Sequence, residues 1–468
     1  MKGFATFVLF FAVFAFSQAR TVTGSVVSEG EKLSGVLVTD GLNFTHTSKQ
    51  GKFKMNIYDN AEFVYIVTPS GYAGDWSAGS PKFYMKAEGE NKFIFNLKKI
   101  GDLSTSYNII AVGDPQPRTR QQADEFADKP LNDLCETISQ TQFPSVGVVL
   151  GDICFDNVSL MQNWRENIVK TGIPFYTVPG NHDYDKSLRS DDKAALSSYR
   201  ENFGPENYAF FLGQDLVIML DNIIYKPEGK YYEGYSDEII QWVKSLMKFV
   251  LPGADIYIAQ HSPLMGRMSK DEYIHNAPAL LDILEGHKVH FISGHNHVGR
   301  NYVHSLSVSE HNLASICGSW WMAYHCKDGT PRGYKVYTKT HKELEWYYKS
   351  VGKDKDFQYE IFTPGECELN PASFVVNLWD YDQDWAIEWY EDGTFKGDMT
   401  RVDEYNPLHK DEIESTFKKL GTPVKSYMKT YKSNHYFVAK PSNGAKEITI
   451  TIRSPFGKAW TETLIINK

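Results

Sequence analysis

Two histidines separated by one residue, His295 and His297, follow directly after a largely apolar segment, residues 289–292. Such a segment is typical of a buried β-strand. Residues i and i+2 of an extended chain point to the same side, so both imidazoles can reach one space just beyond the strand. Neutral imidazole binds zinc, iron and manganese, and the pair therefore indicates a metal site. Two hydrogen-bonded loop histidines are the alternative that this motif alone leaves open.

Four further apolar segments are each followed by polar side chains. Segments 109–112, 146–150, 173–178 and 255–259 precede Asp114 with Gln116, Asp152, Asn181 with His182, and His261, in that order. Open α/β sheets bind their ligands at the carboxyl ends of their strands. The positions of these residues therefore predict that the loops converge on one site.

The region from 108 to 349 alternates such strands with amphipathic stretches. These stretches predict helices near residues 124–141, 159–171, 237–249 and 277–284. Alternation of this kind is typical of an α/β core. The flanking regions, by contrast, are rich in short strands and turns. They predict a β-sandwich over residues 20–99, similar to the transthyretin-like module, and a β-rich accessory domain over residues 352–468.

Taken in chain order, the strand-end residues resemble the calcineurin-like metallophosphoesterase family. The family blocks D-x-H, G-D, G-N-H-D/E, an isolated H and G-H-x-H correspond here to D-P-Q at 114–116, G-D at 151–152, G-N-H-D at 180–183, His261 and G-H-N-H at 294–297. With its flanking β modules the chain is similar to exported Bacteroides-type members. The resemblance implies a four-layer α/β/β/α catalytic core over residues 100–351.

The resemblance also implies a pair of divalent or trivalent metal ions (Mn, Fe or Zn) bridged by Asp152. Asp114, Gln116 and His297 would complete the first metal site, and Asn181, His261 and His295 the second. Two cations about 3.5–4 Å apart repel each other, and a shared carboxylate relieves that repulsion. Gln116 stands where many members have histidine. Its amide oxygen is a weaker ligand, or it hydrogen-bonds to a coordinated water.

Residues beside these ligands are predicted to act on the substrate. The resemblance implies that His182 faces the substrate and either donates to a phosphate oxygen or protonates the leaving group. Its neighbour Asp183 is expected to orient the ring, which suits a general acid. Capping of the following segment is the alternative role for Asp183. Trp320 and Trp321 follow the last metal block and either line the substrate pocket or pack in the core.

Three arginines lie near these ligands in the sequence. Arg118, Arg120 and Arg300 are expected at the solvated surface, with contact to phosphate as the alternative.

The implied activity is hydrolysis of a small phosphate monoester by a hydroxide held between the two metals. The same chemistry serves phosphodiesterases and pyrophosphohydrolases, which remain open. The alternative from another class is a non-catalytic envelope or glycan-binding protein. A net charge of −9 with interspersed acids and bases, and no basic stripe, argues against nucleic-acid binding.

The amino terminus predicts export. Met1-Lys2, an apolar run over residues 4–16 and small residues at Ser17 and Ala19 form a signal-peptide pattern over residues 1–19. The mature protein is thus expected to be periplasmic or secreted. No later stretch approaches ~18 consecutive apolar residues, so stable membrane insertion is not expected.

The cysteines are five in number. Cys317 and Cys326 are the pair closest in sequence that could form a disulfide, but buried free thiols are favoured.

Overall fold

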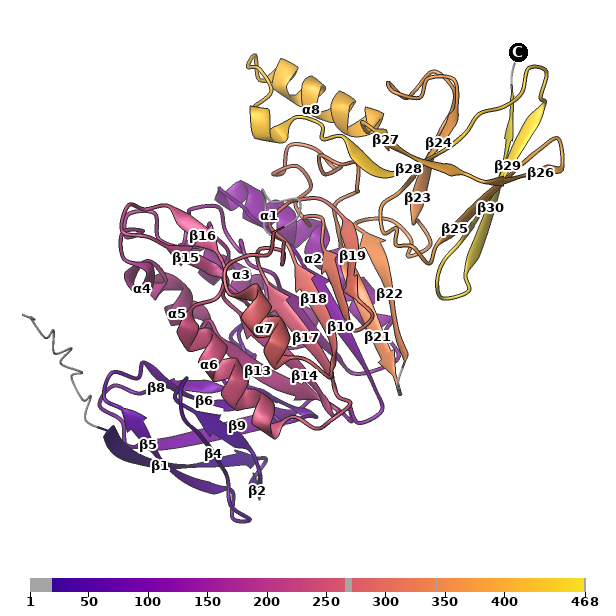
Figure 1. Ribbon diagram of the computed structural model, residues 1–468. Helices are drawn as coiled ribbons and strands as arrows, with labels where there is room; N and C mark the ends of the chain where they lie inside the picture. Colours follow the sequence, from indigo (N-terminus) through magenta and orange to yellow (C-terminus); the bar gives the residue numbers. More distant parts are fainter. Residues whose placement is uncertain (1–18, 266–271, 342, 467–468) are drawn as a thin grey trace, which may run out of the picture.

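The computed structural model describes residues 19–265, 272–341 and 343–466 (Figure 1). The predicted signal peptide therefore falls outside the described residues, except for Ala19, which begins β1 (Ala19–Ser28). Its cleavage stays a prediction. So do the predicted domain boundaries, although β-rich regions flank the central core at both ends as expected (Figure 1).

The N-terminal region consists of two small sheets. Strand order is β2-β1-β9-β7, with β5 paired to β1, in one sheet and β4-β3-β6-β8 in the other. The remaining strands are β2 (Glu31–Lys32), β3 (Leu37–Thr39), β4 (Phe44–His46), β5 (Lys52–Tyr58), β6 (Phe63–Val67), β7 (Tyr72–Gly74), β8 (Tyr84–Lys86) and β9 (Lys92–Lys99). Burial alternates residue by residue along β5 and β9, as expected for strands with one face in a core.

Two larger sheets form the centre of the molecule. The first, in the order β12-β11-β10-β21-β22, contains β10 (Ser106–Val112), β11 (Ser145–Val149), β12 (Phe175–Thr177), β21 (Gly333–Thr340) and β22 (Glu343–Ser350). The second, in the order β13-β14-β17-β18-β20-β19, contains β13 (Tyr208–Leu212), β14 (Asp215–Leu220), β17 (Asp255–Gln260), β18 (Lys288–Ser293), β19 (Arg300–Ser305) and β20 (Val308–Asn312). Neighbours β10, β11 and β12 run parallel, as do β14, β17, β18 and β20.

Helices cover the outer face of each central sheet. One hydrophobic cluster joins β10 and β11 of the first sheet to β14 and β17 of the second, and it continues to residues of α6 (Asp237–Leu246) and α7 (Ala277–Ile283). A second cluster joins the opposite face of β10 to α1 (Arg120–Asp128), α2 (Pro130–Ser139) and α3 (Leu160–Ile168). The order of layers is helix, sheet, sheet, helix, which confirms the predicted α/β/β/α core.

The predicted helix near 124–141 is in fact two helices. Pro130 begins α2, and because its ring clashes with a preceding turn of helix, α1 ends just before it. The short helices α4 (Asp192–Ala195) and α5 (Ser197–Phe203) precede β13, and the hairpin β15 (Ile223–Tyr225) with β16 (Tyr231–Glu233) follows β14.

The C-terminal region contains two four-stranded sheets and one helix. The sheets are β23-β24-β28-β27 and β26-β25-β29-β30. The elements are β23 (Tyr359–Phe362), β24 (Phe374–Leu378), β25 (Ala386–Glu391), β26 (Thr394–Asp398), β27 (Thr400–Glu404), α8 (Pro407–Lys419), β28 (Ser433–Ala439), β29 (Glu447–Arg453) and β30 (Ala459–Ile465). Helix α8 was not predicted, although Asn406 before Pro407 is a helix-start signal. The Asn406 side chain accepts the His409 N–H.

All five cysteines are free thiols. Cys135 is half-buried and the other four are buried, so the favoured prediction is confirmed and a Cys317–Cys326 disulfide is wrong. Within the described residues, no helix is both long and apolar enough to cross a bilayer.

Candidate metal centre and active site

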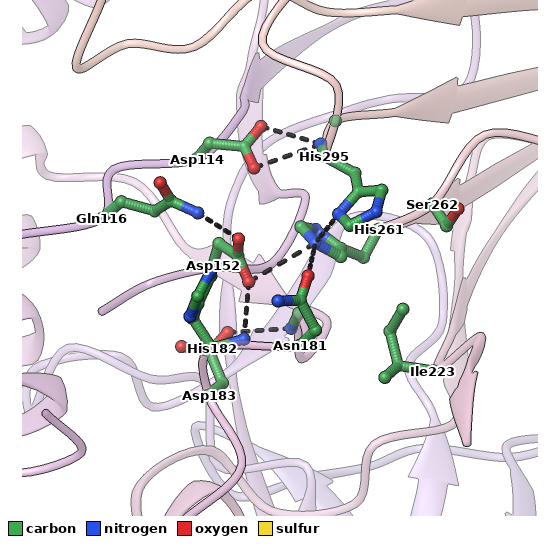
Figure 2. A network of polar contacts seen from close by, with 12 residues as sticks. Asp114, Gln116, Asp152, Asn181, His182, Asp183, Ile223, His261, Ser262 and His295 are labelled. Carbon is green, nitrogen blue, oxygen red and sulfur yellow. Dashed lines mark hydrogen bonds and ion pairs between the residues drawn. The ribbon is translucent and has the colours of Figure 1, made fainter. Parts of the chain in front are cut away.

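The loops after the central strands bring all seven predicted metal ligands into one region of the core. Figure 2 shows six of them, all but His297. Five of the seven have a left-handed backbone: φ is 49° at Asp114, 43° at Gln116, 52° at Asp152, 70° at His295 and 53° at His297. This conformation costs energy for residues with a Cβ and persists only where the surroundings impose it. Strain concentrated at these positions marks a functional site.

One half of the site is organised around the His261 ring. His261 Nδ1 donates to the Leu150 carbonyl at 2.7 Å, so the lone pair of Nε2 faces the site. Burial lowers the pKa of His261 to about 4, with the nearby His295 also contributing, and the ring is therefore neutral at pH 7. Nε2 lies 3.1 Å from Asn181 Oδ1 and 3.4 Å from Asp152 Oδ1 (Figure 2). Three acceptor atoms thus converge.

The fourth group of this half is His295. Its Nδ1 lies 2.9 Å from His261 Nε2, and its Nε2 lies 3.1 Å from Glu233 Oε1 on β16. A carboxylate only accepts, so in the neutral ring the proton sits on Nε2 and Nδ1 presents a lone pair. Asp152, His261 and His295 each offer a ligand atom within 4.8 Å of the others. Converging lone pairs of nitrogen and oxygen repel one another unless a cation lies between them, and this donor set fits a transition metal.

The other half contains Asp114, Gln116 and His297. His297 Nε2 is 3.6 Å from Asp114 Oδ1, and both Asp114 oxygens accept the His295 backbone N–H at 3.0–3.1 Å. Burial raises the pKa of Asp114 well above its ordinary value, and the Asp152 charge adds to the rise. A cation would stabilise both carboxylates, so these residues also fit a metal.

Gln116 presents its amide nitrogen, not its oxygen, to the site. Nε2 donates to Asp152 Oδ2, while the buried Oε1 has no hydrogen-bond partner among the described residues. Rotating the amide by half a turn exchanges the two atoms and aims the oxygen at the site. The Gln116 side chain is therefore within reach of either predicted role.

Asp152 lies between the two halves, where a bridging ligand must be. Burial favours its neutral form, but the facing rings of His261, His182 and His295 outweigh it and hold the pKa of Asp152 below the ordinary value. Its Oδ1 also accepts the His182 backbone N–H at 2.9 Å. The carboxylate is thus held in position by the segment that carries the proposed acid.

The carboxylate that orients His182 is Asp156, not Asp183. His182 Nδ1 lies 2.9 Å from Asp156 Oδ1, which also accepts from Arg189 Nη2 at 2.7 Å. Phe155 stacks on the other side of the ring, with centroids 3.8 Å apart. Asp156, Arg189 and Glu233 were not predicted from the sequence as site residues. The available signal for Asp156 was its place four residues after Asp152 in the G-D-I-C-F-D segment.

The predicted role of Asp183 is therefore wrong. Its buried carboxylate accepts three backbone N–H groups, from Gly180 at 2.9 Å and from Ile153 and Cys154 at 3.1 Å. These donors turn the side chain away from the His182 ring. Burial, reinforced by the Asp152 charge, raises the pKa of Asp183 to about 7. Asp183 joins the two ligand-bearing loops, and it does not cap the following segment.

Both tryptophans pack against ligand-bearing loops. The Trp320 ring stacks on His297 with centroids 4.4 Å apart and is only 9% exposed. The Trp321 indole N–H donates to the Pro115 carbonyl at 3.0 Å. Both residues have positive φ, 53° and 64°. They support the metal ligands from the side, and their contact with substrate stays a prediction.

Comparisons with known proteins agree with this geometry. Three family models match successive parts of the chain: N terminal of calcineurin-like phosphoesterase over residues 20–100, calcineurin-like phosphoesterase over residues 107–299, and C terminal of calcineurin-like phosphoesterase over residues 310–460. The chain belongs to the calcineurin-like phosphoesterases, which act on phosphate esters and use divalent metals. The predicted family is confirmed.

Individual relatives are distant. A probable glycerophosphodiester phosphodiesterase GpdQ from Arcobacter nitrofigilis is 27% identical over 122 residues, which make up 26% of this chain and 42% of that protein. The chain thus matches less than half of the length of this curated relative. Among solved structures, a dimetal phosphatase from Danio rerio is 16% identical, with a TM-score of 0.35, over 51% of this chain and 98% of that one. A 5'-nucleotidase from Candida albicans is 11% identical, with a TM-score of 0.33, over 52% of each chain.

Proposed function

We propose that this protein is a dinuclear, metal-dependent hydrolase of phosphate monoesters. The observation that carries the proposal is the convergence of lone pairs from Asp152, Asn181, His261 and His295 beside the His182–Asp156 pair. When bound, a pair of metal ions (Mn, Fe or Zn) supplies electrophilic activation of the phosphoryl group and lowers the pKa of a water molecule.

Residues of the chain itself donate the proton and hold the donor in position. Asp156 engages His182 Nδ1, so the proton that the ring can give to substrate is the one on Nε2. A water molecule loses one proton to solvent, and its oxygen bonds to phosphorus as the ester P–O bond breaks. The departing oxygen takes the proton from His182 Nε2, and solvent then reprotonates the ring. Phe155 and Arg189 restrict the ring and its carboxylate to this arrangement.

Phosphodiester hydrolysis is the second candidate function. It is supported by the identity of 27% with a protein described as a probable glycerophosphodiester phosphodiesterase. The predicted signal peptide over residues 1–19 supports a periplasmic or secreted location for either activity.

The test compares turnover of p-nitrophenyl phosphate with turnover of its bis-ester, with added manganese, iron or zinc and with chelator. We expect metal-dependent release of nitrophenol from the monoester and little from the bis-ester; the reverse preference would favour the diesterase. The Asp152→Asn variant should lose activity together with bound metal, measured by elemental analysis. Asp102→Asn, at an exposed carboxylate, is the matched control. No turnover of either ester with any metal would refute both activities and favour a binding protein.

A further inference from the structure

We propose that a group of cationic and aromatic side chains beside the site selects phosphate esters whose leaving group carries a second anionic group. The members of this group, here called the rim, are Arg118, Arg300, Tyr427 and Tyr431. Two come from the segment after α8, so the C-terminal region contributes to substrate choice. The proposal deepens the proposed function and rests on it.

Arg118 reaches the site through a stack of planar groups. Its guanidinium carbon lies 3.7 Å from the centroid of the Phe155 ring, and Phe155 in turn stacks on His182 at 3.8 Å with planes 22° apart. Stacking fixes the face of a guanidinium on the ring and leaves its N–H edges to point sideways. Because His182 is the group proposed to face the leaving oxygen, Arg118 is assigned to the leaving-group side of the site.

Tyr427 connects this stack to the metal side. Its hydroxyl accepts from Arg118 Nη2 at 3.4 Å, and its ring meets Trp320 edge-on with centroids 5.0 Å apart. Trp320 stacks on His297. Contacts therefore run from the proposed acid, through Arg118 and Tyr427, to a proposed metal ligand. A leaving group that departs past His182 meets this chain of side chains.

Arg300, three residues after His297, likewise contacts an aromatic ring and a tyrosine hydroxyl. Its Nη2 donates to the Tyr431 hydroxyl at 3.0 Å, and the guanidinium lies 5.4 Å from the Tyr431 ring centroid. Lys327 adds a third cation, 6.0 Å from the same ring, and its carbonyl accepts the Tyr431 backbone N–H at 2.6 Å. Arg118 and Arg300 are thus partly exposed, as expected, but each also contacts an aromatic ring; their contact with phosphate stays a prediction.

The charges of the two rim arginines are not neutralised within the protein. Across the described ranges, neither Arg118 nor Arg300 has a carboxylate within 4 Å, whereas Arg120 pairs with Asp124 at 2.9 Å and Arg200 with Glu206 at 2.6 Å. A guanidinium has five N–H donors. Phenol hydroxyls engage one donor of Arg118, through Tyr427, and two of Arg300, through Tyr302 and Tyr431. In a chain of net charge −9, two uncompensated guanidiniums at one site favour an anionic ligand.

The experiment uses three esters with a common phenyl scaffold. These are 4-carbamoylphenyl phosphate, whose leaving group is neutral, and 4-carboxyphenyl and 4-phosphonophenyl phosphate, whose leaving groups are anionic. The last two separate a carboxylate from a phosphoryl ligand. We expect the full-length metal-loaded enzyme to prefer one or both charged esters in kcat/KM.

Arg118→Met keeps the stem on Phe155 but removes the charge. Because a hydrogen bond to a charged group contributes strongly, the variant should lose roughly ten- to a hundredfold of the charged-to-neutral preference, chiefly through KM. Arg118→Lys should restore part of it. Arg300→Met should act in the same direction, while Arg120→Met, the matched control, should keep both activity and preference.

Two outcomes overturn the inference in distinguishable ways. In the first, wild-type enzyme hydrolyses the neutral ester, and Arg118→Met and Arg300→Met either leave the charged-to-neutral preference unchanged or lower kcat/KM for all three esters equally. The rim then does not select the leaving group, and the hydrolase proposal stands. If no ester is hydrolysed with any metal, the proposed function itself fails. Should Arg118→Met not fold, Tyr427→Phe, which removes only the hydroxyl that positions Arg118, must lower the charged-to-neutral preference for the inference to hold.

Discussion

One buried histidine joins α8 to the core through two carboxylates. His325 lies in the loop after Trp321, with Nδ1 2.8 Å from Glu412 Oε1 on α8 and Nε2 3.3 Å from Glu360 Oε1. Burial disfavours the charged ring, but hydrogen bonds and charge from the two carboxylates outweigh it and raise the pKa of His325 to about 9. Because α8 packs on Trp320, this ion pair supports the wall of the site.

The pKa shift sets both the size and the pH window of the effect. The pKa rises from 6.5 in the unfolded chain to about 9 in the folded one, and each pKa unit corresponds to about 1.4 kcal/mol. The pair therefore adds at most about 3 kcal/mol to the free energy of unfolding. Since the folded pKa is the higher one, the contribution is complete below pH 6.5, declines above it and is lost above pH 9.

The perturbation is His325→Gln, compared with wild type by urea unfolding between pH 6 and pH 10. Hydrogen exchange of peptides spanning 407–419 identifies the transition in which α8 unfolds. We expect the variant to be less stable by about 2–3 kcal/mol at pH 6 and nearly equal to wild type at pH 10. A stability difference that does not change with pH would show that His325 acts through packing alone and would refute the charge argument.

Three further results are expected at the site. Asp152→Asn should lower turnover by at least about a thousandfold and reduce bound metal, since one carboxylate serves both ions; full activity would exclude it as the bridge. Gln116→His should slow loss of the more labile metal to chelator by about tenfold, because imidazole is the stronger ligand; unchanged release would place residue 116 outside the coordination sphere. Asp156→Asn should lower kcat by about a hundredfold on an alkyl phosphate and much less on p-nitrophenyl phosphate, whose leaving group needs no proton. Equal losses on both would mean that Asp156 does not act through His182.

Local rules were enough to predict which polar residues converge, and the family resemblance implied that they are metal ligands. Buried strands are visible as apolar runs, and in parallel α/β sheets the residues just after them meet at one edge. This reasoning located Asp114, Asp152, Asn181 and His261. Because residues i and i+2 of an extended chain point to the same side, it also placed His295 beside His297. The alternation of elements likewise predicted an α/β core, and the resemblance to the family implied that it holds two sheets.

Partners contributed from elsewhere in the chain were decided by the tertiary structure. Asp183 is adjacent to His182, yet three backbone N–H groups donate to its carboxylate. Asp156, from another loop, contacts the His182 ring instead. Glu233 contacts His295 from the β15–β16 hairpin, more than sixty residues away in the sequence.

The contacts of the rim are also decided by the tertiary structure. Tyr427 follows Arg118 by more than three hundred residues, and only chain folding brings them together. Sequence spacing determines which side chains share a face over a few residues. Which distant group meets a ring depends on turn conformation and packing, and these are properties of the whole fold.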